Sequence, residues 1–240
     1  MPNTIAIFGA GTGLGAATAR RFGREGYAVA LVARRREPLD ALVATLAQEG
    51  IEAAAFTADL ADSAGIPALI AAITERFGRI DVLEYAPIGA SALFQPAAEL
   101  TEERLRPLVD LYLYTPLAIA KAVLPQMLER GDGAILLGQG LSAVFGTPGL
   151  SGLGPVMAAT RNWIQSLNGE LAERGVYAGM LTVGAWIEGS AGHQAASAAD
   201  PSLGGAATVD PAELAEQYWE LVVKRDRVEQ IFPPVQLPPR

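Results

Sequence analysis

Short apolar runs alternate with longer alanine-rich stretches along most of the chain, and this alternation limits the folds that it can adopt. The apolar runs have the length of strands and lack the apolar–polar alternation of half-exposed strands, so we expect them to be buried on both faces. The predicted strands are 4–8, 28–33, 51–58, 80–86, 134–138 and 176–183, and the predicted helices are 13–25, 38–48, 65–77, 101–114, 116–129 and 155–173. The pattern predicts an α/β fold with a doubly wound parallel sheet, in three α/β/α layers.

The length and composition fit one domain. The chain has 240 residues, of which 50% are apolar and 18% are charged. These values are typical of a globular protein that is large enough to bury a substantial core. The sequence shows no compositional break that suggests a linker and no internal repeat. We therefore expect a single domain over residues 1–240.

The charges and the rare residues exclude several classes of function. Eighteen basic and 26 acidic residues give a net charge of −8, which argues against binding to nucleic acid or to an anionic membrane surface. Cysteine is absent, so disulfides and thiolate metal sites are excluded. One histidine, His193, leaves no set of ligands for zinc and no Ser-His-Asp triad. We expect no metal site.

The sequence gives no sign of export or of a membrane span. The first residues lack the basic and long apolar regions of a signal peptide. Only 133–160, which carries no ionisable side chain, is long enough to raise the question of a membrane helix. Its seven glycines and two prolines argue against such a helix. We expect a cytoplasmic protein.

The last quarter of the chain has a different character. Residues 186–209 are rich in glycine, alanine and serine, which predicts a mobile loop or lid. Asp210 and Pro211 then form a helix start signal, with Glu213 in the first turn, and the helix should end near Lys224. Residues 228–232 form a possible final strand, and 233–240 read as an extended tail.

A glycine-rich turn follows the first predicted strand and opens the first helix. Glycines at this junction allow the backbone to approach a pyrophosphate, and the helix N-terminus supplies free N–H groups. A glycine-rich turn alone is a weak motif. Because this turn lies between a predicted strand and a predicted helix, we predict that it binds a dinucleotide. The expected cofactor contacts here are Gly9, Gly11, Thr12, Gly13, Leu14 and Gly15.

The end of the second predicted strand indicates which nicotinamide cofactor binds. An acidic residue there typically holds the ribose hydroxyls of NAD, whereas arginine accommodates the 2′-phosphate of NADP. This strand ends in Arg34, Arg35 and Arg36, with no acidic residue. A solvated basic turn is the alternative, but a triple arginine in an acidic protein favours a phosphate ligand. We therefore expect NADP(H), bound by Arg34 and Arg35.

At this point the chain resembles the short-chain dehydrogenase/reductase (SDR) family, which has the Rossmann fold, over nearly its whole length. The turn matches the family's Thr-Gly-x-x-x-Gly-x-Gly, with Phe8 in place of threonine. The resemblance implies that Asp59 and Leu60 lie at the adenine, and that Ala86 and Ile187 contact the cofactor. Further landmarks match in order and spacing: Pro125-Gln126-Met127, Gly131-Asp132-Gly133, Pro148-Gly149 and Glu170-Leu171-Ala172.

The resemblance implies a changed catalytic site. The family uses a tyrosine as proton donor, a lysine that stabilises the phenolate, a serine and often an asparagine. Counting from the matching landmarks puts Leu153 at the tyrosine position, Met157 at the lysine position, Gly140 at the serine position and Tyr112 at the asparagine position. The family's Asn-Asn-Ala-Gly has likewise become residues 85–88, Tyr-Ala-Pro-Ile. We therefore expect a divergent member without the usual mechanism.

Several residues are candidates to take over parts of the lost chemistry. Tyr112 and Tyr85 should point toward the nicotinamide end, as proton donors or as aromatic filling of the vacated space. Trp186 and His193 could line a substrate pocket, although Trp186 could be a buried anchor and His193 a solvated loop residue. Ser142, near Gly140, reads as a solvated loop serine or a displaced hydroxyl. Arg161 reads as a surface residue or a displaced cation.

Three functions remain open. The first is an NADP(H)-dependent oxidoreductase that acts on a small carbonyl compound or an activated C=C bond without Tyr–Lys chemistry. The second is a non-catalytic NADP(H)-binding sensor or the partner subunit of an active relative. The third is a lyase or isomerase on this scaffold. Relatives pair through the helices equivalent to 101–129 and 155–173, so the resemblance implies a homodimer or homotetramer.

Overall fold

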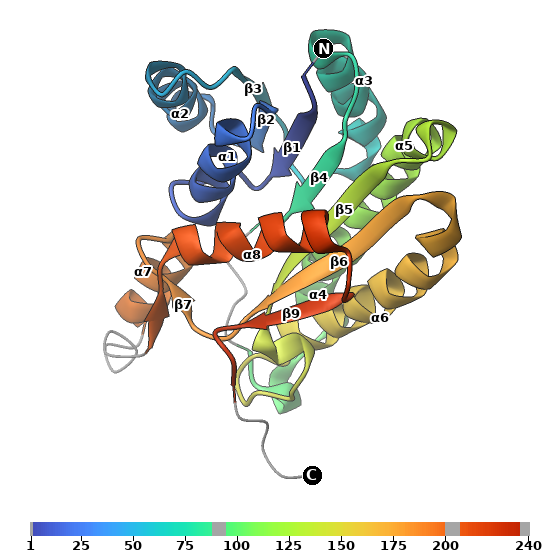
Figure 1. The fold of residues 1–240 in the computed structure, drawn as a ribbon. Helices are drawn as coiled ribbons and strands as arrows, with labels where there is room; N and C mark the ends of the chain where they lie inside the picture. The colour runs from blue at the N-terminus through green and yellow to red at the C-terminus, as the bar shows by residue number, and fades with distance from the viewer. Residues whose placement is uncertain (1, 88–94, 200–206, 236–240) are drawn as a thin grey trace.

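The computed structural model describes residues 2–87, 95–199 and 207–235, and a seven-stranded parallel sheet lies at its centre (Figure 1). The strand order is β3-β2-β1-β4-β5-β6-β9, which confirms the predicted doubly wound fold. Its strands are β1 (Thr4–Phe8), β2 (Ala28–Ala33), β3 (Ala53–Thr57), β4 (Val82–Tyr85), β5 (Gly133–Gly140), β6 (Val176–Val183) and β9 (Glu229–Phe232).

Helices cover both faces of the sheet and form two cores. One core joins α1 (Leu14–Arg24), α2 (Arg36–Gln48) and α8 (Pro211–Lys224) to one face. The other joins α3 (Ile66–Phe77), α5 (Thr115–Arg130) and α6 (Leu153–Leu171) to the opposite face. Figure 1 shows α8 crossing in front of the sheet, with α5 and α6 on the other side. The strands are apolar toward both layers, as the absence of alternation predicts.

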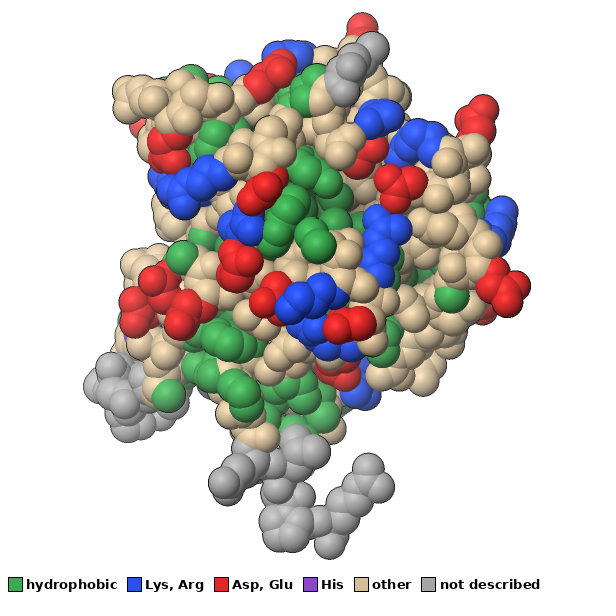
Figure 2. Space-filling view, viewed as in Figure 1, with side chains coloured by type: hydrophobic (Ala, Val, Ile, Leu, Met, Phe, Trp, Pro, Cys, Tyr) green, Lys and Arg blue, Asp and Glu red, His purple; other side chains and the backbone are tan. Residues whose placement is uncertain are grey.

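The surface over α1 and α8 carries paired charges of both signs. Arg21 of α1 pairs with Glu216 of α8, and Lys224 and Arg227 both contact Glu220. Figure 2 shows basic and acidic side chains interspersed on this face, with no expanse of one sign. This surface therefore offers no extended field that would attract a polyanion.

The helical region 102–130 differs from the prediction of two separate helices. α4 (Glu102–Val109) continues through a π-helical turn (Asp110–Tyr114) into α5 without a break. This run, Glu102–Arg130, is the one helix among the described residues that is long and apolar enough to cross a membrane by length and composition alone. The uncharged stretch 133–160, whose glycines and prolines argue against a membrane helix, forms β5, a loop with the short helix Leu141–Ala143, and the start of α6.

Residues 186–209, predicted as a loop or lid, contain regular structure. Strands β7 (Trp186–Ile187) and β8 (Thr208–Val209) pair in parallel, and α7 (Ala191–Ala199) lies between them in sequence. The predicted start of α8 is confirmed, since the Asp210 carboxylate accepts a hydrogen bond from the Ala212 N–H at 2.7 Å. The predicted tail 233–240 lies partly outside the described residues, from residue 236 onward.

Candidate functional site

The strand order reverses direction at β1, which lies between β2 and β4. In doubly wound sheets the ligand binds in the crevice at this switch point, outside the carboxyl ends of the strands. The glycine-rich turn, the end of β2 and the end of β4 all lie at this edge because the strands are parallel. The sequence-predicted cofactor residues are thus brought to one edge of the sheet.

The glycine turn needs its glycines for steric reasons. Gly9 has a φ of +98°, and a Cβ atom there would lie 2.6 Å from the Cα atom of Pro87. A Cβ atom at Gly15 would lie 2.8 Å from the Cα atom of Ala10, where α1 packs against the turn. Gly13 precedes α1, and no side chain of the described residues caps this helix. The N–H groups of Leu14 and Gly15 are therefore available to an anion, whereas the Ala16 N–H donates to the Gly11 carbonyl at 3.1 Å. Gly11 and Thr12 are at the solvent-exposed tip, and Leu14 is buried.

The segment after β6 lies against this turn. A Cβ atom at Gly13 would be 3.8 Å from the side chain of Ile187 and 3.5 Å from that of Ser190. Ile187 is therefore at the turn, as the resemblance implies. Sequence reasoning missed Ser190, a buried residue whose Oγ accepts a hydrogen bond from the His193 N–H at 3.1 Å. Nothing in its glycine- and alanine-rich surroundings marks it in the sequence.

The three arginines after β2 differ in their partners. Arg36 donates to the Asp40 carboxylate at 2.8 Å, within α2. Arg34 and Arg35 are exposed and form no hydrogen bond or ion pair with any residue of the described ranges. Two unpaired guanidinium groups therefore remain at the carboxyl end of β2, where they can bind an anion.

The loops after β3 and β4 complete this edge. Asp59 is exposed, and its side chain accepts a hydrogen bond from the Ala61 N–H at 3.0 Å. Leu60 is buried, and its carbonyl accepts a hydrogen bond from the Thr115 hydroxyl of α5 at 2.6 Å. Ala86 lies directly after β4, with its N–H donating to the Phe8 carbonyl at 3.1 Å. Position 88, the last of the replaced Asn-Asn-Ala-Gly motif, lies outside the described residues.

The other part of the edge, around the start of α6, is apolar. Leu153 and Met157 are 8% and 9% exposed and belong to a cluster with Leu108, Tyr112, Ala143 and Val156. The two positions that the sequence aligns with the family's tyrosine and lysine are thus filled by packed hydrocarbon and thioether groups. We call this set the apolar cluster. No residue of it carries an ionisable group except the Tyr112 phenol.

Ser142 is buried, so the expectation of a solvated loop serine is wrong. The short helix Leu141–Ala143 turns it inward, and its hydroxyl lies 4.0 Å from the place of a Cβ atom at Gly140. Gly154 of α6 packs on the same residue, because a Cβ atom there would lie 2.8 Å from the Ser142 carbonyl oxygen. The backbone geometry therefore places a hydroxyl near the vacated serine position.

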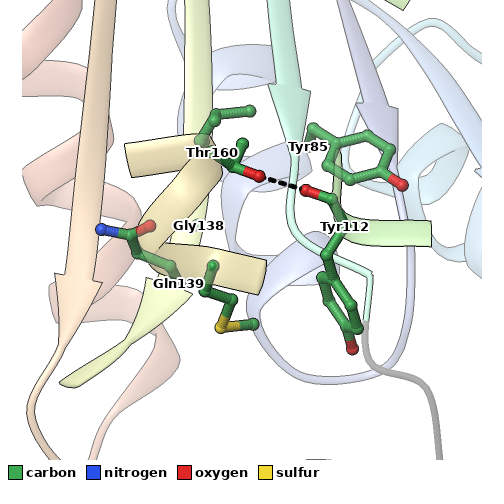
Figure 3. A pocket seen from close by; sticks show the side chains of 7 residues that line it. Tyr85, Tyr112, Gly138, Gln139 and Thr160 are labelled. Carbon is green, nitrogen blue, oxygen red and sulfur yellow. Dashed lines mark hydrogen bonds between the residues drawn. The ribbon is translucent and has the colours of Figure 1, made fainter. Parts of the chain in front are cut away.

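A small pocket opens beside the apolar cluster (Figure 3). Its volume is about 10 Å³, which is close to the room that a single water molecule needs. It is formed where β4, β5, α6 and the π-helical turn meet. Its lining residues are Tyr85, Tyr112, Leu137, Gly138, Gln139, Met157 and Thr160.

The π-helical turn explains the hydroxyl groups in this pocket. The Thr115 N–H bonds to the Asp110 carbonyl, five residues back, and Pro116 has no N–H to offer the carbonyls of Leu111 and Tyr112. Two side chains from other elements replace the missing donors. The Tyr85 hydroxyl donates to the Leu111 carbonyl, and the Thr160 hydroxyl donates to the Tyr112 carbonyl.

Tyr85 and Tyr112 both line the pocket, but their hydroxyls point differently. Figure 3 shows the ring of Tyr112 directed away from Gln139 and Thr160, with its hydroxyl at the far end. Burial, together with the neighbouring Tyr112, raises the pKa of Tyr85 well above its usual value. The Tyr85 hydrogen is engaged at Leu111, which favours the structural alternative for this residue over a proton-donating role.

Arg161 does not reach the pocket. Its guanidinium forms hydrogen bonds to both carboxylate oxygens of Glu229 on β9, with Nε at 3.0 and 3.1 Å. The positive charge of Arg161 is thus paired with Glu229 and is not available as a displaced catalytic cation. Arg161 lies on the partly exposed side of α6, in agreement with the surface alternative.

Trp186 and His193 stack on each other, with ring centroids 6.0 Å apart and an angle of 19° between the planes. The His193 Nε2 atom is buried and has no hydrogen-bond partner in the described part of the chain. His193 is only partly exposed, so the expectation of a merely solvated residue is wrong, because α7 folds it onto the indole.

Sequence reasoning also missed a buried acidic side chain at this edge. Glu84 of β4 is 1% exposed, and burial raises its pKa to about 8, a rise that Tyr218 partly opposes. Neither Glu84 Oε1 nor the Tyr218 hydroxyl completes a hydrogen bond of normal geometry with the described residues. A Cβ atom at Gly138 would lie 2.4 Å from the Tyr218 oxygen, so glycine makes room for this phenol.

The doubly wound fold and the glycine turn at the carboxyl edge of its sheet are the features of a dinucleotide-binding α/β protein. The profile of the short chain dehydrogenase family matches residues 3–191. The chain belongs to this family of oxidoreductases, as its sequence landmarks predict.

Known proteins agree with this assignment. The chain is 28% identical to the human dehydrogenase/reductase SDR family member 4 over 77% of its length, and the aligned segment covers 66% of that relative. A single-residue variant of the actinorhodin polyketide ketoreductase, solved with NADPH, is 26% identical at a TM-score of 0.81, with 95% and 94% of the two chains covered. An NADPH-bound short chain oxidoreductase from Pseudomonas aeruginosa PAO1, which contains an atypical catalytic center, shares the fold at 22% identity and a TM-score of 0.81, with 98% of each chain covered.

Proposed function

We propose that this protein binds NADP(H) and transfers hydride without the family's Tyr–Lys chemistry, to an activated C=C bond in a small organic substrate. The observation that carries this proposal is the apolar cluster around Leu153 and Met157. A phenol and an ammonium group cannot act where a leucine and a methionine are packed. The missing groups are the ones that protonate a reduced carbonyl.

The cofactor part of the proposal rests on the free groups at the carboxyl edge of β1 and β2. The glycines at positions 9 and 15 leave no room for a Cβ atom, and they form a cradle that a pyrophosphate could approach. Arg34 and Arg35 are exposed cations at the carboxyl end of β2 with no partner among the described residues, and we assign them to the 2′-phosphate. Asp59, Ala86 and Ile187 would contact the remaining parts of the cofactor.

Bound NADPH would supply the hydride, and the residues of the chain decide which acceptor can use it. A carbonyl oxygen that gains negative charge needs hydrogen-bond donors or a proton source in the site. The hydroxyl hydrogens of Tyr85 and Thr160 are engaged by backbone carbonyls. An activated C=C bond can take its proton from water or from Tyr112, so it requires least from the groups that have been replaced.

A second function has its own support. The pocket holds about one water molecule, and the apolar cluster closes the space beside it. A site without room for a substrate fits a non-catalytic NADP(H)-binding sensor or a partner subunit of an active relative. In that case Ile187 and Ser190, which lie against the glycine turn, would respond to cofactor binding.

The two functions are separated by binding and turnover in the same protein. We expect NADPH and NADP⁺ to raise the melting temperature more than NADH does. NADPH oxidation is then followed with saturated ketones and with enones as acceptors. Enone reduction supports the oxidoreductase, and binding without any turnover supports the sensor. Absence of NADPH binding would refute both.

We further propose that the chain forms a homodimer or homotetramer through the helix that contains α4 and α5. Tyr114 and Leu117 lie three positions apart on this helix and are 57% and 36% exposed, so they offer adjacent apolar side chains to a second copy of the chain. Light scattering on the purified protein should give at least twice the mass of one chain. Tyr114→Glu should lower that mass, and a monomeric wild type would refute the proposal.

A further inference from the structure

A chain of hydrogen bonds connects the pocket to the surface of the molecule. The Gln139 side-chain amide lines the pocket and donates to the Thr182 hydroxyl at 3.0 Å. Thr182 donates in turn to the Glu229 carboxylate at 2.7 Å, and Arg161 donates to the same carboxylate. Gln139 and Thr182 are buried, whereas Arg161 is partly exposed.

The charges at the outer end fix the direction of every hydrogen bond in this chain. Burial alone would raise the pKa of Glu229, but hydrogen bonds from Arg161 and Thr182 outweigh it, and the pKa is lowered. The ionised carboxylate can only accept, so the Thr182 hydroxyl must donate to it. A hydroxyl has one hydrogen, and Thr182 can therefore only accept from Gln139.

The orientation of the Gln139 amide follows from this. Its NH₂ group must face β6, where its second hydrogen meets the Met180 sulfur at 3.3 Å. The carbonyl oxygen is then turned the other way and accepts no hydrogen bond within the described ranges. Figure 3 shows the amide nitrogen pointing away from Thr160 and the oxygen pointing toward the interior of the site.

The hydroxyl groups of Thr160 and Tyr85, which also line the pocket, present acceptors as well. The Thr160 hydrogen is directed at the Tyr112 carbonyl, with the Val156 carbonyl at 3.2 Å, and the Tyr85 hydrogen is directed at Leu111. Their free lone pairs remain. A ligand group in this pocket would thus meet side-chain oxygens that accept hydrogen bonds, beside the apolar surfaces of Leu137 and Met157.

We propose that this pocket is a subsite for one hydrogen-bond donor on the ligand, a hydroxyl group carried by an otherwise apolar molecule, and that Gln139 binds it through Oε1. The inference rests on the proposed function, since it narrows the substrate class of the same site. The volume of the pocket suits a single such group and not a whole substrate. Thr182, Glu229 and Arg161 are positioning residues that hold the amide in the accepting orientation.

The test compares two ligands of nearly equal shape, cyclohexanol and fluorocyclohexane. Only the alcohol has a hydrogen to donate, and neither reacts with NADPH. We measure their dissociation constants by ligand-observed NMR on the 240-residue chain, with and without NADPH. We expect the alcohol to bind about threefold to tenfold more tightly, the value of one net hydrogen bond.

Variants distinguish orientation from packing. Gln139→Met keeps the length of the side chain and removes the acceptor, so the preference for the alcohol should disappear. Thr182→Val keeps the branched shape but releases the amide, which can then turn its NH₂ group toward the pocket, and the preference should fall toward equality. A merely structural role of Thr182 would weaken both ligands equally. Thr45→Val, which removes an exposed hydroxyl on α2, is the matched control and should keep the wild-type ratio.

The remaining outcomes would refute either the subsite or the proposed function. Equal affinity of the two ligands in the wild type, or no binding of either, would overturn the subsite. So would an unchanged preference in Gln139→Met. Failure of NADPH itself to bind would refute the proposed function, whereas the ratio of the two ligands on the cofactor-free protein would still decide the assignment of the pocket.

Discussion

The carboxyl edge of the sheet has two parts, one around β1 and β2 and one around β4, β5 and α6, and their polar groups differ in whether they have hydrogen-bond partners. Around β1 and β2, donors are left free as far as the described residues go: the start of α1 has no side-chain cap, and the guanidinium groups of Arg34 and Arg35 have no partner. Around β4, β5 and α6 the hydroxyl hydrogens of Tyr85 and Thr160 are used inside the protein, and apolar side chains fill most of the space beside the small pocket at Gln139. Free donors indicate a site prepared for an anion, whereas engaged hydroxyl hydrogens leave only hydrogen-bond acceptors for a ligand.

The largest expected effect concerns Glu84, on β4 at the border between the two parts. Its folded-state pKa of about 8 lies above the usual value of 4.5, so the unfolded chain loses this proton first as the pH rises. The contribution of Glu84 to the free energy of unfolding should therefore be greatest below about pH 4.5. It should decrease as the pH rises to about 8, by as much as about 5 kcal/mol in total.

Urea unfolding of Glu84→Gln across pH 5 to 9 checks this. The variant should lose the downward slope and exceed the wild type in stability at pH 8, because a neutral amide has no proton to release. Glu103→Gln, at an exposed position of α4, is the control and should keep the wild-type slope. Parallel curves for Glu84→Gln and the wild type would show that Glu84 is ionised in the folded protein.

The next effect tests whether the start of α6 is core. Met157→Lys places a charge among Leu108, Tyr112 and Leu153, and should lower the free energy of unfolding by roughly 3 kcal/mol. Met157→Leu should cost less than about 1.5 kcal/mol. Denaturant titration measures both. A lysine variant as stable as the wild type would mean that this region is open to solvent.

In the nucleotide part, Arg34→Asp should weaken NADPH binding by about a hundredfold, since it replaces a charge-assisted contact with repulsion. NADH binding should change by less than about threefold, because NADH lacks the 2′-phosphate. Isothermal titration gives both constants. Arg36→Asp makes the same change of charge at an arginine that already pairs with Asp40, and should have a smaller effect. Equal losses for NADPH and NADH in Arg34→Asp would contradict the assignment.

The smallest effect concerns the donors that replace the N–H missing at Pro116. Tyr85→Phe leaves the Leu111 carbonyl without a hydrogen bond and should cost about 1 kcal/mol of stability. Thr160→Val does the same at the Tyr112 carbonyl. Thermal unfolding should show both losses, with NADPH binding unchanged. Loss of turnover in Tyr85→Phe without loss of stability would instead make Tyr85 a catalytic residue.

The sheet and the glycine turn could be predicted because they depend on local patterns. Continuous apolar runs such as 28–33 are sufficient to predict buried parallel strands, and a glycine cluster between strand and helix predicts a tight turn. The Arg34 and Arg35 cluster could be found in the same way, from residues adjacent in sequence.

The pocket could not be predicted because its groups depend on distant partners. The orientation of Gln139 is set by Glu229, which lies 90 positions later and on another strand. Pro116 is visible in the sequence, but the shift of its helix into a π-helical turn depends on hydroxyls from β4 and α6. Burial of Ser142 and stacking of His193 likewise follow from tertiary contacts. Local propensity carries no information about such long-range hydrogen bonds.

The central claim is that the chain binds NADPH but has replaced Tyr–Lys carbonyl chemistry by packed apolar side chains. Its most direct test is the rate of NADPH oxidation with cyclohexanone, in wild type and in Leu153→Ala, Met157→Ala and Tyr112→Phe. We predict no ketone-dependent oxidation in any of them, although NADPH binds. Robust ketone reduction that is abolished in Leu153→Ala or Met157→Ala and retained in Tyr112→Phe would contradict the claim.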